Sequence, residues 1–85
     1  MAVYVNKLRT RFGGLSLCHL LADSLDELHA MARKIAVEPS LFQHDHIPHY
    51  DLSRAKRDQA IAAGAKIIDR HELAQLVERF SKKAS

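Results

Sequence analysis

The chain has 85 residues and a mass of 9.6 kDa, so we expect a single compact domain over residues 1–85. Hydrophobic residues make up 47% and charged residues 27%, a composition that argues against disorder. No apolar run approaches the roughly 20 residues of a membrane helix, and the N-terminus lacks a signal-peptide layout. The single cysteine, Cys18, excludes a disulfide framework. These features predict a cytoplasmic protein without a membrane partner.

The net charge of +3 is unevenly distributed along the chain. Basic residues cluster near the N-terminus, in the middle and at the C-terminus: Lys7, Arg9 and Arg11, then Arg54, Lys56 and Arg57, then Lys82 and Lys83. Such clusters favour an anionic partner, although a solvated surface has the same pattern.

The first half of the chain predicts two strands and a helix. Residues 2–5 and 15–22 are apolar, and we expect them to form an antiparallel hairpin around Gly13-Gly14, with the second strand central and covered on both faces. Ser24 and Glu27 have the spacing of a capping box at a helix start. Apolar residues then recur at helical spacing, and Glu38-Pro39 predicts the end of this helix.

The second half predicts alternating strands and helices. Residues 41–43 favour a third strand, 44–49 a loop, and 50–52 a further extended segment. Asp51 or Ser53 can cap a second helix that runs to about residue 63, where Gly64 is typical of a helix C-terminus. A short strand follows at 65–68. Asp69 and Glu72 repeat the capping-box spacing before an amphipathic last helix, with residues 81–85 expected to fray.

This order predicts an α/β fold. We expect a three- to four-stranded mixed sheet, an N-terminal β-hairpin followed by βαβαβ, with helices packed on it and a C-terminal amphipathic helix. Strands that alternate with helices imply parallel pairing. Ligands gather at the carboxyl ends of such strands, which here are Asn6, the Ala22-Asp23 turn, residues 44–51 and Asp69.

Residues 44–51 are the densest group of potential ligands. Three imidazoles and two carboxylates occur within eight residues, and these are the ligand types of divalent metals such as zinc or manganese. One interpretation is therefore a metal site formed by His44, His46 and His49. The alternative is that His44 and His46 are exposed loop residues.

A phosphate site is the second interpretation of the same region. His49 and Asp51 precede a predicted helix whose first turns carry basic side chains, and a helix N-terminus favours phosphate. His49 is a candidate general acid or base that Asp51 orients, and His19 is a second candidate if its strand ends nearby. The predicted phosphate-binding residues are Arg54, Lys56, Arg57 and Arg9. The alternatives are Asp51 as a helix cap, His19 as a core residue and the cations as solvated surface.

Several segments resemble a small bacterial and phage family, the domain of unknown function 4031 (DUF4031). The resemblance covers about residues 2–68 and leaves the last helix largely outside. An acidic residue usually stands in the family where this chain has Asn6. The matching segments are Val3-Tyr4-Val5-Asn6, Arg11-Phe12-Gly13, Cys18-His19-Leu20, Ala22-Asp23, Glu27-Leu28-His29, Phe42-Gln43, His49-Tyr50-Asp51-Leu52, Lys56-Arg57 and Gly64-Ala65.

The resemblance implies no activity, but it favours some polar residues over others. It implies one polar site made of His19, His49, Asp51, Lys56 and Arg57, and it weakens a metal role for His44 and His46. We therefore expect the protein to bind a phosphate-bearing ligand, either a nucleotide or a nucleic-acid end, with phosphoester hydrolysis at a His/Asp site. The alternative is a non-catalytic binding or sequestering module. A homodimer would add stability to so short a chain.

Overall fold

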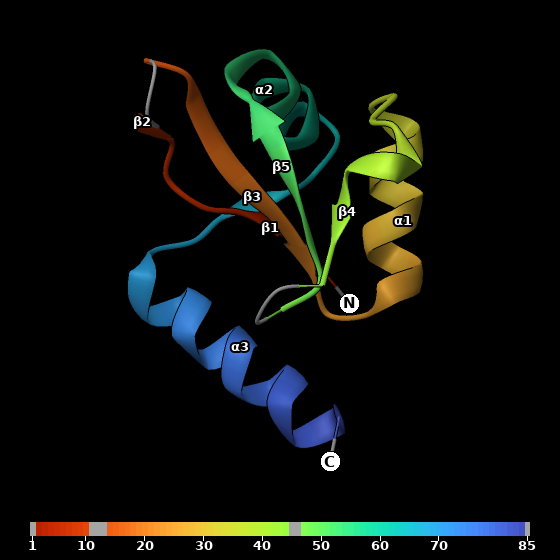
Figure 1. Cartoon of the computed structure of the whole chain (residues 1–85), viewed down its shortest axis with the longest axis vertical. Helices are drawn as coiled ribbons and strands as arrows, with labels where there is room; N and C mark the ends of the chain where they lie inside the picture. Colours follow the sequence, from red (N-terminus) through yellow and green to blue (C-terminus); the bar gives the residue numbers. More distant parts are fainter. Residues whose placement is uncertain (1, 11–13, 45–46, 85) are drawn as a thin grey trace.

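A six-stranded mixed sheet with three α-helices forms the fold in the computed structural model, which describes residues 2–10, 14–44 and 47–84 (Figure 1). The strands are β1 (Val3–Val5), β2 (Arg9–Thr10), β3 (Ser16–Ala22), β4 (Phe42–Gln43), β5 (His49–Ser53) and β6 (Lys66–Ile67). The helices are α1 (Leu25–Lys34), α2 (Arg54–Ala62) and α3 (Arg70–Ala84), with a short 3₁₀ helix at Pro39–Leu41. The α/β class is confirmed. The sheet has more strands than the three to four expected, and β2, a two-residue strand, was not predicted from the sequence.

Strand β3 is the centre of the sheet, as its apolar sequence predicted. The order is β4-β5-β3-β1-β6, and β2 also pairs with β3. β1 and β3 form the expected antiparallel hairpin, but β3 and β5 are also antiparallel, and the parallel pair is β1 with β6. The expectation of parallel neighbours was wrong for β5 because the β4–β5 hairpin inserts β5 between β4 and β3. Helices α1 and α2 therefore join parallel strands that are not adjacent.

This topology separates the predicted ligand-binding ends. The carboxyl ends of β1, β5 and β6 lie at the same end of the strands. β3 runs antiparallel to them, so its carboxyl end lies at the opposite end of the sheet. The prediction that the Ala22-Asp23 turn lies with Asn6 and Asp69 was therefore wrong. Asp23 instead holds the start of the chain, since its carboxylate accepts hydrogen bonds from the Ala2 amide at 2.9 Å and the Tyr4 hydroxyl at 2.8 Å.

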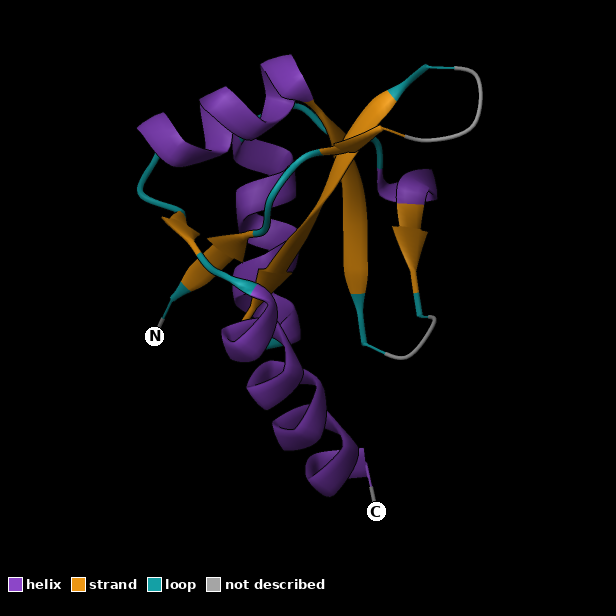
Figure 2. Ribbon diagram, turned by 90° about the vertical axis from the view of Figure 1, so that its left-hand side faces the viewer, coloured by secondary structure: helices purple, strands orange, loops and turns teal. Residues whose placement is uncertain are grey.

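The two faces of the sheet have unequal cores. Alternate residues of β3 point to opposite faces. Leu20 and its neighbours Cys18 and Ala22 pack with residues from α1 and α2 in the larger core. On the other face, Leu21 packs with Ile47, Ile68 and Leu76, beneath α3. The C-terminal part of α3 extends beyond the sheet (Figure 2). His19 alternates with Leu20 and so belongs to the α3 face.

The helix starts agree with the capping signals. The Ser24 hydroxyl accepts the Glu27 amide at 3.2 Å, and the Asp69 carboxylate accepts the Glu72 amide at 2.8 Å. Ser53, not Asp51, caps α2. Helix α3 continues to residue 84, past the point where fraying was expected. None of the described helices is long and apolar enough to cross a membrane.

Helix α1 ends at Lys34, earlier than Glu38-Pro39 predicted. Ala36 adopts a left-handed backbone with φ of 60°, and the Val37 amide then donates back to the Ala32 carbonyl at 2.8 Å. This is the Schellman arrangement, in which glycine normally takes the left-handed position. Gly64, with φ of 110°, has that place after α2. The signal was missed at α1 because the residue there is alanine.

Replacing Ala36 by glycine is expected to stabilise the protein. The left-handed conformation costs an L-residue about 1–2 kcal/mol, which glycine avoids. Glycine also gives the unfolded chain more conformational freedom, and this offsets part of the stabilisation. Ala36→Gly should therefore raise the free energy of unfolding by about 0.5–1 kcal/mol in a urea titration. Ala30→Gly, at an exposed position inside α1, is the control and should lower it by about 1 kcal/mol. Equal effects of the two substitutions would contradict the assigned helix end.

Candidate functional site

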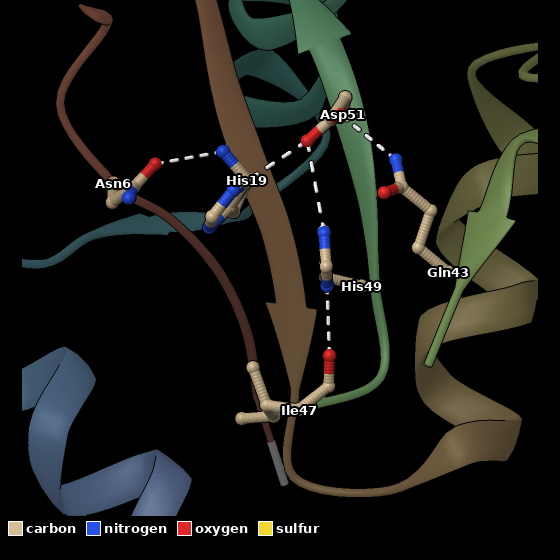
Figure 3. Close-up of polar contacts among 6 residues, drawn as sticks. All are labelled: Asn6, His19, Gln43, Ile47, His49 and Asp51. Carbon is tan, nitrogen blue, oxygen red and sulfur yellow. Dashed lines mark hydrogen bonds and ion pairs between the residues drawn. The ribbon is translucent and has the colours of Figure 1, made fainter. Parts of the chain in front are cut away.

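The candidate site lies on the α3 face of the sheet, where three polar side chains meet across β3 and β5 (Figure 3). His19 pairs directly with Asp51 in the antiparallel register of the two strands. His49 lies two residues before Asp51 on β5, so its side chain points to the same face. The strand register therefore brings together the three residues that the sequence proposed as catalytic.

The three side chains are close but not in mutual hydrogen-bond contact. His19 Nε2 lies 3.5 Å and His49 Nε2 3.8 Å from the same carboxylate oxygen, Asp51 Oδ1. The two imidazole rings are tilted by 43° with centroids 4.4 Å apart. One donor atom from each of the three residues lies within 4.8 Å of the others. Imidazole nitrogen and carboxylate oxygen are also donors that bind divalent transition metals.

The two oxygens of Asp51 have different surroundings. Oδ2 accepts a hydrogen bond of 2.7 Å from Nε2 of Gln43, on the neighbouring strand β4. Oδ1 is buried, and no hydrogen-bond donor among the described residues reaches it. A buried carboxylate oxygen without a donor is costly, so this atom is a place where a positively charged partner would be favoured.

His49 is held in one orientation. It is buried, with 6% of its surface exposed, and its Nδ1 lies 2.7 Å from the Ile47 carbonyl oxygen. Because a carbonyl only accepts, Nδ1 carries the proton, and in the neutral ring Nε2 has the free lone pair. That lone pair belongs to the atom nearest Asp51.

Asn6 connects the end of β1 to this cluster. Its side-chain oxygen accepts a hydrogen bond of 2.7 Å from the His19 backbone amide. Its own backbone carbonyl accepts one of 3.0 Å from Nε of Arg57. The residue therefore positions the His19 backbone and brings a guanidinium to the end of β1.

A groove of about 340 Å³ opens beside His19. Its lining includes two exposed cationic residues, Lys7 and Arg9, and the apolar side chain of Leu73 on α3. Arg9 pairs with Leu17 on β3, two residues from His19, so Arg9 and His19 share a face of the sheet. A smaller hollow of about 190 Å³ shares Asn6, Lys7, Arg9 and Leu73 with this groove and adds Ile68, Asp69 and Arg70.

The other predicted phosphate-binding residues have different positions. Lys56 Nζ donates to the Ile35 carbonyl at 2.6 Å and thereby ties α2 to the end of α1. Arg57 bonds to Asn6 as described, and Arg54 is exposed in the first turn of α2. Neither Lys56 nor Arg54 lines the groove beside His19. A phosphate role for these two residues stays a prediction.

The histidine-rich segment is only partly described. The exposed His44 packs edge-on against the Phe42 ring, with ring centroids 4.4 Å apart. His49 is opposite Gln43, not His44, in the pairing of β4 with β5. His46 lies outside the described residues, so a site of His44, His46 and His49 stays a prediction. His29 belongs to the opposite face, where its Nδ1 accepts a hydrogen bond from, or donates one to, the Tyr50 hydroxyl at 2.8 Å.

Two contributors to the site were not recognised from sequence. Gln43 was assigned only to a strand, although its pairing with His49 places its amide beside Asp51. Its position beside Asp51 follows only from the register of β4 against β5, which the sequence does not show. Asn6 was noted only as a strand end where ligands gather, and its side-chain hydrogen bond to the His19 amide depends on the β1–β3 pairing.

The family model "Protein of unknown function (DUF4031)" matches residues 3–80. This chain belongs to the DUF4031 family. The match extends past residue 68, where the sequence resemblance was expected to stop, and includes most of α3. That extension has a structural basis, because Leu76 of α3 is buried against Leu21 of β3. No curated protein and no solved structure matched this DUF4031 chain.

Cys18, next to His19 on β3, is expected to be unreactive in the folded protein. It is 2% exposed, and burial raises the pKa of its thiol from 9.0 to about 11. At pH 8 the thiolate is then about a thousandth of the population. A disulfide-exchange reagent should label the native protein slowly and the guanidinium-unfolded protein completely, at one thiol per chain. Rapid labelling of the native protein would contradict the buried position of β3.

Proposed function

We propose that this protein binds a phosphate-bearing ligand, either a nucleotide or a nucleic-acid end, and hydrolyses a phosphoester bond with its His/Asp site. One observation carries the proposal. His19 belongs both to the cluster with His49 and Asp51 and to the lining of the basic groove. A phosphate held by Lys7 or Arg9 would therefore lie next to proton-transferring side chains.

The charge of the grooves supports an anionic ligand at this position. Lys7 and Arg9 line the groove beside His19, which has no acidic residue in its lining, and the adjoining hollow adds one cation, Arg70, and one carboxylate, Asp69. Arginine and lysine are the usual partners of phosphate oxygens. A larger groove of about 430 Å³ beside α3 has two carboxylates, Glu72 and Glu78, and one cation, Arg79, which is already paired with Asp23, so its lining disfavours a phosphate. The smaller groove is therefore the better candidate despite its size.

The groove volume favours a small ligand. At about 340 Å³ it lies near the lower end of known small-molecule sites. It would take the phosphate and sugar of one nucleotide, free or at the end of a strand. The apolar side chains of Leu17 and Leu73 offer a surface for the sugar or base.

The chemistry would be attack of water on phosphorus. A neutral imidazole accepts a proton as water oxygen bonds to phosphorus. The ester P–O bond breaks, and the leaving oxygen takes a proton, so the products are an alcohol and a phosphate with one ester bond fewer. His19 suits the proton transfer better than His49, because its side chain is 28% exposed against 7%. Asp51 would orient and stabilise the protonated ring.

Removing the groove arginine should weaken ligand binding. We expect Arg9→Ala to raise the dissociation constant for a mononucleotide about tenfold, as loss of one charge-assisted contact implies. The measurement is the thermal shift against a panel of mononucleotides and short 5′-phosphorylated oligonucleotides, at low and high salt. Arg33→Ala is the control, since Arg33 is exposed in the last turn of α1, on the other face of the sheet. A nucleotide shift that Arg9→Ala leaves unchanged would exclude the groove as the binding site.

Removing the accessible imidazole should abolish most turnover. His19→Ala is expected to lower the rate of hydrolysis 10²- to 10⁴-fold, the usual contribution of a general acid or base. Release of nitrophenolate from bis(p-nitrophenyl) phosphate and p-nitrophenyl phosphate measures diester and monoester cleavage. His71→Ala, an exposed histidine on α3, serves as control. His49→Ala should also lose activity, and its circular dichroism must show that the fold remains.

The binding and catalytic parts of the proposal separate in these assays. Saturable nucleotide binding without product would leave a non-catalytic or sequestering module as the function. The sequence also led us to expect a cytoplasmic location and a homodimer, and both remain part of the proposal. Light scattering at micromolar concentration tests the second expectation.

A further inference from the structure

We propose that His19, His49 and Asp51 bind a divalent first-row transition-metal ion through the two Nε2 atoms and Asp51 Oδ1. This inference rests on the proposed function for the role of the metal, and on side-chain geometry alone for its binding. It differs from a metal site in the 44–49 segment, because His19 and Asp51 lie outside that segment. All three ligands are on the paired strands β3 and β5, whose register fixes their positions.

The donor atoms are spaced almost as a bound ion requires. Metal–nitrogen and metal–oxygen distances near 2.1 Å place tetrahedral ligand atoms about 3.4 Å apart. His19 Nε2 and His49 Nε2 lie 3.5 and 3.8 Å from Asp51 Oδ1, and one ligand atom from each of the three residues lies within 4.8 Å of the others. Rotation of the more exposed His19 ring would bring the two nitrogens closer, without moving the buried His49.

The cluster also has the surroundings of a metal site. Ligand histidines usually donate their other ring nitrogen to a carbonyl or carboxylate, which fixes the free lone pair on the metal. His49 does this through Nδ1 and the Ile47 carbonyl at 2.7 Å. Gln43 holds the other oxygen of the Asp51 carboxylate at 2.7 Å. What remains is a buried Oδ1 that no described donor reaches, aimed between two imidazoles.

A protonated histidine is the competing explanation for this arrangement. An imidazolium would be expected to approach a buried carboxylate to about 2.7–2.9 Å. Both nitrogens instead stop at 3.5 Å or more, and two rings surround one oxygen. A cation between the three atoms accounts for this spacing better than a hydrogen bond does.

The donor set selects the kind of ion. Two imidazoles and one carboxylate suit Zn²⁺, Mn²⁺, Fe²⁺ or Co²⁺, whereas Mg²⁺ prefers oxygen ligands only. Three protein ligands leave a coordination position open, as in catalytic rather than structural sites. An ion there would make water a better nucleophile and polarise a phosphate oxygen, which is the chemistry the proposed hydrolysis needs. With the ion bound, the metal replaces His19 as the group that activates water, because a coordinated Nε2 has no lone pair to accept a proton.

Metal binding is tested without any phosphate ligand. Tag-free protein is stripped with a chelator and titrated with Zn²⁺, Co²⁺, Mn²⁺ and Mg²⁺, with calorimetry and thermal melting as readouts. We expect one Zn²⁺ or Co²⁺ per chain and, at a hundred times the dissociation constant, a rise in melting temperature of about 10 °C or more. Mg²⁺ should give no shift. Bound Co²⁺ should add visible absorption bands whose intensity reports the number of ligands.

Asp51→Asn separates a ligand from a merely structural residue. The asparagine oxygen can still accept from Gln43, and its amide group can donate to the lone pair of His49 Nε2. The chelated variant should therefore melt at the same temperature as the chelated wild-type protein or higher, and yet lose the Zn²⁺ shift. A lower melting temperature together with an unchanged Zn²⁺ shift would overturn the proposal.

Histidine variants locate the ion. His19→Ala should bind Zn²⁺ at least a hundredfold more weakly, whereas His44→Ala and His71→Ala should bind it as the wild type does. Loss of Zn²⁺ binding in His44→Ala but not in His19→Ala would place the ion in the 44–49 segment and overturn the proposal. Absence of Zn²⁺ binding by the wild-type protein, at a Zn²⁺ concentration 100 times that of the protein, would also overturn it. Metal binding without nucleotide binding would leave this inference intact and contradict the proposed function, and the reverse result would contradict the inference alone.

Discussion

Strand β3 pairs with β5 in a register that sets Leu20 against Tyr50 on one face and His19 against Asp51 on the other. The first pair is buried in the larger core, and the second forms the candidate site. A shift of one residue in this pairing would exchange the two faces, and would bury charge while exposing Leu20. The stability of the core therefore enforces the geometry of the polar cluster, although no polar group of the cluster contributes to that core.

Local sequence signals predicted most helices and strands, whereas the order and direction of the strands in the sheet depend on long-range pairing that these signals do not show. Ser24, Ser53 and Asp69 each begin a helix because their side chains satisfy free amides at its start, an interaction that depends on residues three positions apart. Gly64 ended α2 for an equally local reason. The position of β5 could not be obtained this way. Its placement between β3 and β4 depends on the antiparallel pairing of β4 with β5, which the predicted loop between them does not specify.

The site had the same division between local and long-range information. His49 and Asp51 share a face because they are two residues apart in β5, although the sequence analysis placed His49 at the end of a loop and only residues 50–52 in an extended segment. His19 joined them only as a conditional candidate, because its distance from His49 depends on the β3–β5 register. Gln43 and Asn6 carry no sequence signal for their roles, since each acts through a partner on another strand. The basic residues of α2 looked suitable by charge, but Lys56 is engaged at the end of α1.

The unequal cores of the two faces determine where amino-acid substitutions affect stability least. Among the described residues, thirteen buried side chains form the core between the sheet and helices α1 and α2, and four, including Leu76 of α3, form the core on the α3 face. The groove and the His/Asp cluster belong to the sparsely packed face. Substitutions there alter charge, groove shape and ligand preference while most of the folding energy, on the opposite face, is untouched. The architecture thus allows the polar face to change at little cost to the stability of the fold.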